Sequence, residues 1–458
     1  MEFIIMQTHK KYPYAYELAA ALAKQQLDPV ELFEETLVNA KASESIFISL
    51  TEEKGRWEAL LASQRLRQGK PASMLDGVPI AWKDNIDIKG YRTTNGTNNR
   101  YFEVPQQDAQ IVIEASSMGL LSTGKTNLSE LAYSGLGINA SFGTPLQVDA
   151  QHEPLVPGGS SSGSAVAVRE GIVSVAVGTD TAGSIRVPAA FNGLVGYKTS
   201  TSTHCQTGIT PLARSLDSVG TIAQCVTDCI LVNNCLKGVS PSLPSPKKTS
   251  EITLVVDENI LSSIELEEAV QKNFDKTLYT LKNAGISVIY KTLTSVEQAR
   301  SLIATHQWLG SMEAYLEFGH LLQDPNTLNL DKRISSRLKS ADSKTLAQLA
   351  KIRDLQHKLM SRVSYELSNA VLILPTVRHC APYLKSLEKD DELYASTNLS
   401  TLEITMLASF LNMPTFALPN GKDALGRYTS FQLSQPYNCD FELERTALTI
   451  ESLTLNLT

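Results

Sequence analysis

The segment from residue 157 to residue 191 constrains the fold of this chain more than any other. It reads PGGSSSGSAVAVREGIVSVAVGTDTAGSIRVPAAF, so two turns rich in glycine and serine flank a run of small apolar residues. A flexible Gly/Ser linker stays polar, whereas this turn passes directly into the apolar residues 165–168 and 172–177. That order predicts the start of a buried helix followed by a buried strand. The two turns then bring serine hydroxyls and free backbone N–H groups together, as acyl transfer by an activated hydroxyl requires.

The composition narrows the class of protein. The chain has 458 residues, of which 42% are hydrophobic and 19% charged, and this is ordinary for a globular protein with a sizeable core. A net charge of −7 argues against a nucleic-acid partner. No apolar run approaches the ~20 residues of a membrane span, and the first twenty residues lack the order of a signal peptide. We therefore expect a cytoplasmic protein without a nucleic-acid or membrane partner.

Cysteine usage predicts neither disulfides nor a metal site. Six cysteines are scattered through the chain, and Cys225 and Cys229 are one helical turn apart without the further Cys/His pair that zinc needs. Buried free thiols in a cytoplasmic protein are the better interpretation. We expect no metal and no cofactor.

A lysine directly follows the short apolar strand predicted at residues 78–82. Lysines are usually exposed, but Lys83 stands between Trp82 and a turn of sequence KDN. Burial disfavours the ammonium form and lowers the pKa of the side chain, so a buried Lys83 would be a neutral amine able to act as a base.

Residues 119–126, GLLSTGKT, match the phosphate-loop pattern GxxxxGK[ST], and the apolar residues 252–257 end in an aspartate as a Walker-B strand does. The phosphate loop requires a strand before its first glycine and a helix starting at Lys125. Here residues 109–118 have a helical pattern, and the apolar pair Leu120 and Leu121 lies inside the supposed loop. Nucleotide binding is therefore kept only as a remote alternative.

The rest of the chain predicts alternating helices and strands. Asp28 and Pro29 are suited to the start of a helix, and the Pro-, Ser- and Lys-rich residues 237–250 are a candidate boundary. The order strand, helix, strand over residues 252–290 indicates a parallel α/β unit. We further expect helices at residues 52–69, 265–283 and 441–453, mostly helical structure at 295–369, and strands at 371–375, 415–418 and 430–433.

Several motifs in one order resemble the amidase signature family of serine hydrolases. They are GVPIAWKDNID, GKTNLSELA, PGGSSSGSAVAV, GTDTAGSIRVPAAFNGLVGYK, PLARSLDSVG, LILPT and SFQL. The resemblance implies a single α/β domain over residues 1–458 with a large mixed central sheet covered by helices. Its expected parts are N-terminal helices (1–70), a signature core (73–235), an α/β and variable helical region (251–370) and a C-terminal part (371–458). It also implies that residues 237–250 are an internal loop and that GKTN is a structural strand and turn.

The resemblance also implies a Ser-cisSer-Lys triad. Ser184 is the expected nucleophile, Ser160 on a cis peptide relays the proton, and Lys83 starts neutral as the general base. The expected oxyanion hole consists of the backbone N–H groups of Thr181, Ala182, Gly183 and Ser184. Ser161 and Asp180 are expected to support the triad, although ordinary turn hydrogen bonding explains both equally well.

The chain departs from the family pattern at several positions outside the triad. Ser162 and Ala182 stand where glycine is commoner, and both are small enough for the turns to survive. Lys198-Thr199-Ser200 replaces KPT, Asn192 precedes Gly193 where cysteine is usual, and GRYTSFQ near the C-terminus replaces GLPxGxQ.

The expected function is hydrolysis of a small carboxamide to a carboxylic acid and ammonia or an amine. The alternative is the glutaminase (A) subunit of a tRNA-dependent amidotransferase, but Val187 and Asn192 differ from the glutamine and cysteine of that group. A phosphate-loop nucleotide-binding protein is the remote third. We expect the variable residues 295–370 to set which amide is cut, and we expect only a small-molecule amide as partner, with a homodimer left open.

Overall fold

A computed structural model describes residues 8, 11–98, 101–306, 308–323, 330–341 and 346–457. The first part of the stretch that we compared with a signal peptide lies outside these ranges. So do short parts of the region predicted as mostly helical, residues 307, 324–329 and 342–345.

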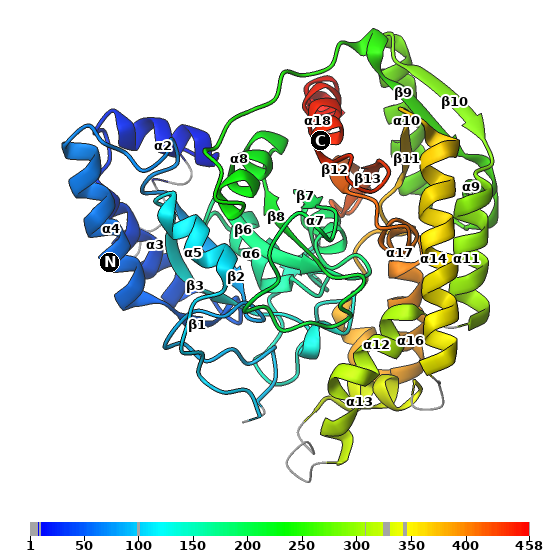
Figure 1. The fold of residues 1–458 in the computed structure, drawn as a ribbon, viewed down its shortest axis with the longest axis horizontal. Coiled ribbons are helices and arrows are strands. Elements are labelled where there is room, and N and C mark those ends of the chain that lie inside the picture. Colours follow the sequence, from blue (N-terminus) through cyan, green and yellow to red (C-terminus); the bar gives the residue numbers. More distant parts are fainter. Residues whose placement is uncertain are drawn as a thin grey trace.

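One mixed β-sheet runs across the molecule, from the N-terminal helices to the long helices of the second half (Figure 1). Within the described residues it has eleven strands. In sheet order they are β1 (Phe47–Leu50), β3 (Leu121–Thr126), β2 (Pro79–Lys83), β6 (Val175–Asp180), β8 (Ser218–Ala223), β7 (Val195–Lys198), β12 (Thr415–Lys422), β13 (Tyr428–Ser434), β11 (Val371–Pro375), β9 (Thr253–Asp257) and β10 (Ser287–Lys291). Strand β2 is parallel to β3 and β6, and β9 is parallel to β10 and β11, whereas the other pairs are antiparallel. The expected mixed α/β sheet in a single domain is confirmed.

Helices cover both faces of this sheet. In chain order they are α2 (Ala15–Ala23), α3 (Pro29–Ala42), α4 (Glu52–Arg67), α5 (Gln110–Ser117), α6 (Ser162–Arg169), α7 (Arg186–Asn192), α8 (Val226–Leu236), α9 (Glu258–Ser263), α10 (Glu268–Asn283), α11 (Thr294–His306), α12 (Leu309–Phe318), α13 (Lys332–Lys339), α14 (Leu346–Leu367), α15 (Leu384–Lys389), α16 (Asp391–Leu402), α17 (Thr405–Phe410) and α18 (Asp440–Thr454). Short 3₁₀ turns are η1 (Glu130–Ala132), η2 (Thr249–Glu251), η3 (Gly319–Gln323) and η5 (Leu455–Leu457), and a separate two-stranded sheet pairs β4 (Gln147–Val148) with β5 (Pro154–Leu155).

The alternation of side chains along β2 separates the two faces. Ile80 and Trp82 pack into the core that contains α5 and α8, whereas Ala81 packs against α6 and α7 on the opposite face. Because side chains alternate along a strand, Lys83 belongs to the same face as Ala81. The sheet therefore directs Lys83 toward the two serine-bearing turns, which lead into α6 and α7.

Residues 237–250 form the last part of the connection between strands β8 and β9, which are far apart in the sheet. Apart from the start of η2, the segment contains no helix or strand, and it crosses from α8 to β9 (Figure 1). It is an internal connection within the sheet. The subdivision of the domain near residues 70, 235 and 370 stays a prediction.

Several predicted boundaries need small corrections. The strand predicted at residues 78–82 is one residue later and includes Lys83, and the helix predicted from residue 265 begins at Glu268. The helix that we ended at Gly69 ends at Arg67, and Gly69 follows with a φ of +66°. Asp28 caps α3 as expected, because its Oδ1 accepts a hydrogen bond from the Val30 N–H at 2.9 Å. Helix ends depend on such capping contacts, which patterns of hydrophobicity locate poorly.

Candidate active site

Two neighbouring parallel strands position the predicted catalytic residues. Strands β2 and β6 pair through Trp82 and Val177, so their carboxyl ends lie at the same edge of the sheet. Lys83 is the last residue of β2, and Ser184 lies in the turn that leads from β6 into α7. The turn of Ser160 immediately precedes α6, and α6 packs against β2, β6 and α7. The parallel pairing thus explains why residues about a hundred positions apart meet.

The Lys83 side chain is completely buried. Its Nζ lies 2.7 Å from Ser160 Oγ, 2.8 Å from Thr179 Oγ1 and 3.2 Å from the Thr179 carbonyl oxygen. As an ammonium, Lys83 donates hydrogen bonds to all three oxygens. A neutral amine has only two N–H groups and one lone pair, so in that form the lone pair could accept the hydrogen of the Ser160 hydroxyl. Burial lowers the pKa of Lys83 to about 7, against a smaller raising effect of the Asp180 and Asp217 charges. This geometry fits a base that is neutral near physiological pH.

Backbone hydrogen bonds hold the two serine turns against each other. The Gly159–Ser160 peptide bond is cis. The Ser161 N–H donates to the Ser184 carbonyl oxygen at 3.1 Å, and the Ser129 N–H donates to the Ser160 carbonyl oxygen at 3.1 Å. Ser184 itself is only 5% exposed, and its hydroxyl has no hydrogen-bond partner within the described part of the chain. The hydroxyl expected to attack a substrate is therefore unengaged.

Free N–H groups line the turn between β6 and α7. Across the described ranges, the N–H groups of Thr181, Ala182, Gly183 and Ser184 donate no hydrogen bond to the protein. Gly183 has a φ of +145°, and a Cβ there would lie 2.4 Å from Thr405 Oγ1, so only glycine fits. The Ala182 carbonyl oxygen accepts a hydrogen bond from Thr405 Oγ1 at 2.6 Å, which fixes the turn from outside. Ala182 has no positive φ, which explains why the departure from glycine is tolerated.

Asp180 orients the start of α7. Its carboxylate contacts the Arg186 guanidinium at 2.9 Å and 3.0 Å and accepts the Ile185 N–H at 3.1 Å, and both charged side chains are completely buried. Burial alone would raise the pKa of Asp180, but the charge and hydrogen bond of Arg186, the Lys198 charge and the Ile185 N–H together outweigh burial and lower the pKa to about 2. The other expected supporting residue, Ser161, donates a long 3.4 Å hydrogen bond to the Thr179 carbonyl oxygen. Both side chains act on backbone next to the triad.

The motifs quoted from the sequence contain further residues of the site to which we assigned no role. Asp217, in PLARSLDSVG, accepts a hydrogen bond from Thr181 Oγ1 at 2.5 Å and from the Leu212 and Ala213 N–H groups. Burial raises the pKa of Asp217 to about 6. Asn85, in KDNID, donates to Thr179 Oγ1 at 3.0 Å, so it orients the group that contacts Lys83. The signal was the motif itself, but only the fold shows what each side chain faces.

The phosphate-loop match does not form a phosphate loop. Gly124 and Lys125 lie inside the buried strand β3, where a loop would be needed, and α5 precedes the first glycine. Lys125 is completely buried and forms an ion pair with Asp84 at 2.8 Å. Its charge is used inside the core, and no helix starts at this residue.

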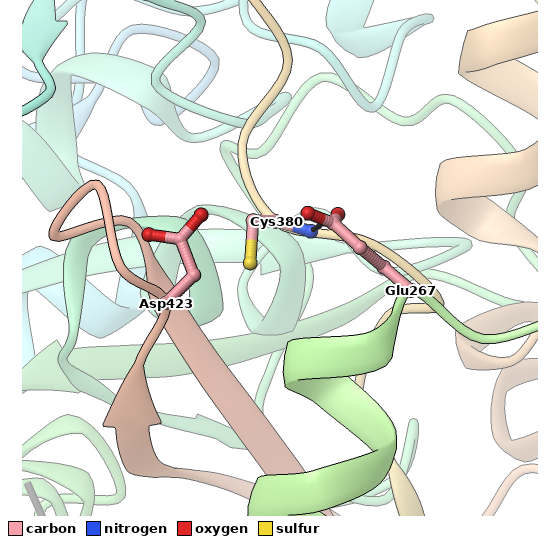
Figure 2. Close-up of side chains that lie close together, drawn as sticks. All are labelled: Glu267, Cys380 and Asp423. Atoms are coloured by element: carbon pink, nitrogen blue, oxygen red, sulfur yellow. Dashed lines mark hydrogen bonds between the residues drawn. The ribbon is translucent and has the colours of Figure 1, made fainter.

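A group of potential metal ligands lies far along the chain from the triad, at Glu267, Cys380 and Asp423 (Figure 2). Arg427 forms ion pairs with Glu267 at 2.5 Å and with Asp423 at 2.7 Å, so both carboxylates already have a cation as partner. Burial raises the pKa of the Cys380 thiol to about 12, and a protonated thiol is a poor ligand. The group is a structural ion-pair cluster.

The six cysteines are unpaired. Cys225, Cys229, Cys235 and Cys380 are buried, in agreement with the expectation, but Cys205 is exposed and Cys439 half-buried. Among the helices of the described ranges, none combines the length and apolar character needed to cross a membrane.

Comparison with known proteins gives consistent similarities along almost the whole chain. The model of the Amidase family matches residues 31–443. The 2-amino-5-chloromuconic acid deaminase of Comamonas testosteroni is 28% identical over 446 residues, which are 95% of each chain. A glutamyl-tRNA(Gln) amidotransferase subunit of Streptococcus pneumoniae strain JJA is 35% identical, but over only 53% of this chain and 50% of that protein.

Solved structures have the same fold. A crystal structure of an amidase superposes with a TM-score of 0.84 at 28% identity, covering 96% of this chain and 99% of the other. The urea amidolyase of K. lactis superposes with a TM-score of 0.81 at 25% identity, and the match covers 95% of this chain but only 26% of that larger protein.

Proposed function

Because this chain belongs to the amidase family and is a hydrolase of amide C–N bonds, we propose that it cleaves a small carboxamide through an acyl-enzyme on Ser184. The products are a carboxylic acid and ammonia or an amine. The observation that carries the proposal is the contact of 2.7 Å between Ser160 Oγ and the Nζ of the completely buried Lys83.

In the proposed first step a proton moves from Ser184 through Ser160 to Lys83 while Ser184 Oγ attacks the amide carbon. Lys83 is suited to receive it, because its pKa of about 7 leaves a large neutral fraction at pH 7 and above. The proton then returns through Ser160 to the leaving nitrogen, and the C–N bond breaks. Water hydrolyses the acyl-enzyme by the same route in reverse, as in other serine–lysine hydrolases.

The free N–H groups of residues 181–184 are proposed to stabilise the oxyanion of both tetrahedral intermediates. Loss of one such donor typically costs about 3 kcal/mol of transition-state stabilisation. Asp180 and Ser161 are proposed as positioning residues, because their contacts hold the backbone of the two turns.

The alternative is the glutaminase component of a tRNA-dependent amidotransferase, since one of the relatives belongs to such an enzyme. Val187 is buried in α7, and the Asn192 side chain donates to the Pro157 and Pro188 carbonyl oxygens at 2.7 Å. Both residues are thus committed to packing where that group is expected to carry glutamine and cysteine. Measuring glutaminase activity with and without a partner protein separates the two functions.

Several expectations accompany the proposal. We propose a small-molecule amide as the sole partner, no cofactor or metal, and a cytoplasmic location, with the homodimer left to measurement. The sequence segments 1–70, 73–235, 251–370 and 371–458 are proposed as parts of one domain.

A fluorophosphonate probe tests the proposal directly. Intact-mass measurement is expected to show a single adduct on the wild type and none on Ser184→Ala. An adduct on both proteins would place the nucleophile elsewhere, and no adduct on either would contradict a serine mechanism. Ammonia release from an amide panel then measures turnover, which Ser184→Ala should abolish.

A further inference from the structure

A cavity of about 500 Å³ is lined mainly by residues of α12, α13 and α16, with residues of α11 and α17 at its wall. These helices gather at one side of the sheet, below α17 in Figure 1. Trp308, Leu399 and Met406 supply apolar lining, and Lys332, Arg333 and Arg337 bring three cations to it. The cavity therefore combines an apolar wall with a positively charged one.

Among the described residues, one of the three cations lacks a carboxylate partner. Lys332 forms an ion pair with Asp391, which also lines the cavity, and Arg333 forms one with Asp331. Arg337 donates from Nη1 to the Tyr133 carbonyl oxygen at 2.8 Å, and its guanidinium lies 4.1 Å from the centre of the Tyr133 ring.

Across the described ranges, Arg337 makes no ion pair. An arginine has five N–H donors, so most of the Arg337 donors remain available. Counted over the described side chains, the cavity thus carries one positive charge without a carboxylate partner.

Residues 133–135, which Arg337 contacts through Tyr133, are hydrogen-bonded to the turn that contains Ser160. The Gly135 carbonyl oxygen accepts a hydrogen bond from the Gly159 N–H at 2.8 Å, and Gly159 precedes Ser160. From the cavity side, the Tyr394 hydroxyl donates to Ser134 Oγ at 2.7 Å, and Asn398 Oδ1 accepts the Gly135 N–H at 2.8 Å.

A second link runs through α17. Met406 lines the cavity, and the preceding Thr405 donates its hydroxyl hydrogen to the Ala182 carbonyl oxygen in the proposed oxyanion turn. The cavity wall is therefore bonded to both turns.

Backbone strain and an unpaired polar group mark the same segment. Leu131 and Ala132 have φ values of +53° and +57°, a left-handed conformation that costs free energy in residues other than glycine. They hold Tyr133, whose buried hydroxyl has no hydrogen-bond partner among the described residues. A buried hydroxyl without a partner is unfavourable.

We propose that this cavity receives the acyl part of the substrate, and that the acyl part has an apolar body ending in a carboxylate. The inference rests on the proposed function above. Trp308, Leu399 and Met406 would contact the body, and the carboxylate would pair with the Arg337 guanidinium, whose planar donors match a carboxylate. In the reaction an ω-carboxy amide and water give a dicarboxylate and ammonia, with no change in oxidation state.

Two matched series of amides test this substrate class. One series ends in a carboxylate (succinamate, glutaramate, adipamate), and the other ends in a methyl group (butyramide, valeramide, hexanamide). The wild type is expected to prefer a carboxylate-ended amide of one length by about 10-fold or more in kcat/KM, since a charge-assisted hydrogen bond contributes that much.

Arg337→Gln is expected to remove that preference, mostly through KM. Lys339→Gln removes the same charge from the same helix at an exposed position outside the cavity, and it should keep the preference. Arg337→Lys, which keeps the charge but not the planar donors, should be intermediate. Equal preference in wild type and Arg337→Gln would overturn the inference, as would a wild type that prefers the methyl series.

A labelling competition separates the two levels of proposal. Glutarate or adipate should slow fluorophosphonate labelling of the wild type but not of Arg337→Gln, whose folding is checked by circular dichroism. Labelling that no dicarboxylate slows, together with hydrolysis of neutral amides only, contradicts the inference and leaves the proposed function standing. No labelling and no hydrolysis in either series contradicts the proposed function, and the inference with it.

Discussion

Two lysines lie completely buried on neighbouring strands, Lys83 at the end of β2 and Lys125 in β3. Lys125 forms an ion pair with Asp84 at 2.8 Å and also contacts Thr93 Oγ1 at 2.6 Å. Lys83 forms no ion pair with any described residue, and its contacts are hydroxyl and carbonyl oxygens. Two lysines equally removed from water therefore differ in one respect, the presence of a carboxylate.

The comparison shows how a carboxylate at contact distance affects the ability of a buried lysine to act as a base. Burial lowers the pKa of both side chains, but the Asp84 charge opposes that effect at Lys125. Without a partner at contact distance, the pKa of Lys83 falls to about 7. A buried ammonium next to a carboxylate holds structure together, whereas an unpaired one gives up its proton near neutral pH.

Replacing Lys83 removes the proposed general base and should have the largest effect on activity. Lys83→Met should lower kcat/KM by about 10²–10⁴-fold, the usual contribution of a general base, while the protein stays folded because no charge is left unpaired. Steady-state ammonia release together with a thermal melt measures both. Full activity in Lys83→Met would exclude the residue as the base.

Replacing Lys125 tests whether its ion pair with Asp84 stabilises the fold. Lys125→Met leaves the Asp84 carboxylate buried without its cation and should lower the free energy of unfolding by about 3–5 kcal/mol. Chemical denaturation measures this change. The double variant Lys125→Met/Asp84→Asn removes the unpaired charge and should recover part of the loss, and a double variant less stable than the single one would contradict the ion-pair explanation.

The pH dependence of activity sharpens the comparison. Lys83 is the active base only when neutral, and its pKa in the folded protein is lowered from the ordinary 10.5 to about 7. We expect kcat/KM to rise with pH, through a midpoint near 7, and to level above it. A neutral, non-titrating amide as substrate makes the profile report the enzyme. A profile that is flat between pH 5 and pH 9 would exclude this assignment.

Asp217 gives the smallest and most selective effect. Its negative charge raises the pKa of Lys83, so Asp217→Asn should move the midpoint of the pH profile to lower pH, by less than about 1 unit for a screened charge. Thr181→Val removes the hydroxyl that donates to Asp217 but keeps the carboxylate, so its midpoint should shift less. A shift to higher pH in Asp217→Asn would show that the charge acts in the opposite sense.

The sequence predicted most of the fold because its signals were local. Small apolar runs between Gly/Ser turns located α6 and β6, and the strand before Lys83 was placed within one residue. The parts of the site that escaped prediction depend on contacts between distant segments. Asp217 meets Thr181 across 36 positions, and Arg337 meets Tyr133 across 204. No local pattern of hydrophobicity encodes such pairs.

The sequence by itself determined that a lysine would end a buried strand and that two serine turns would flank another. These features follow from the period of a strand and from the few residues that tight turns accept. Only the tertiary structure decided which of these two lysines is left without a counter-charge among the described residues. Asp84 is the neighbour of Lys83 in sequence, yet it pairs with Lys125, 41 positions away. Successive side chains along an extended chain point to opposite faces, so adjacency in sequence separates Lys83 from Asp84, and the pairing of β2 with β3 brings Asp84 to Lys125.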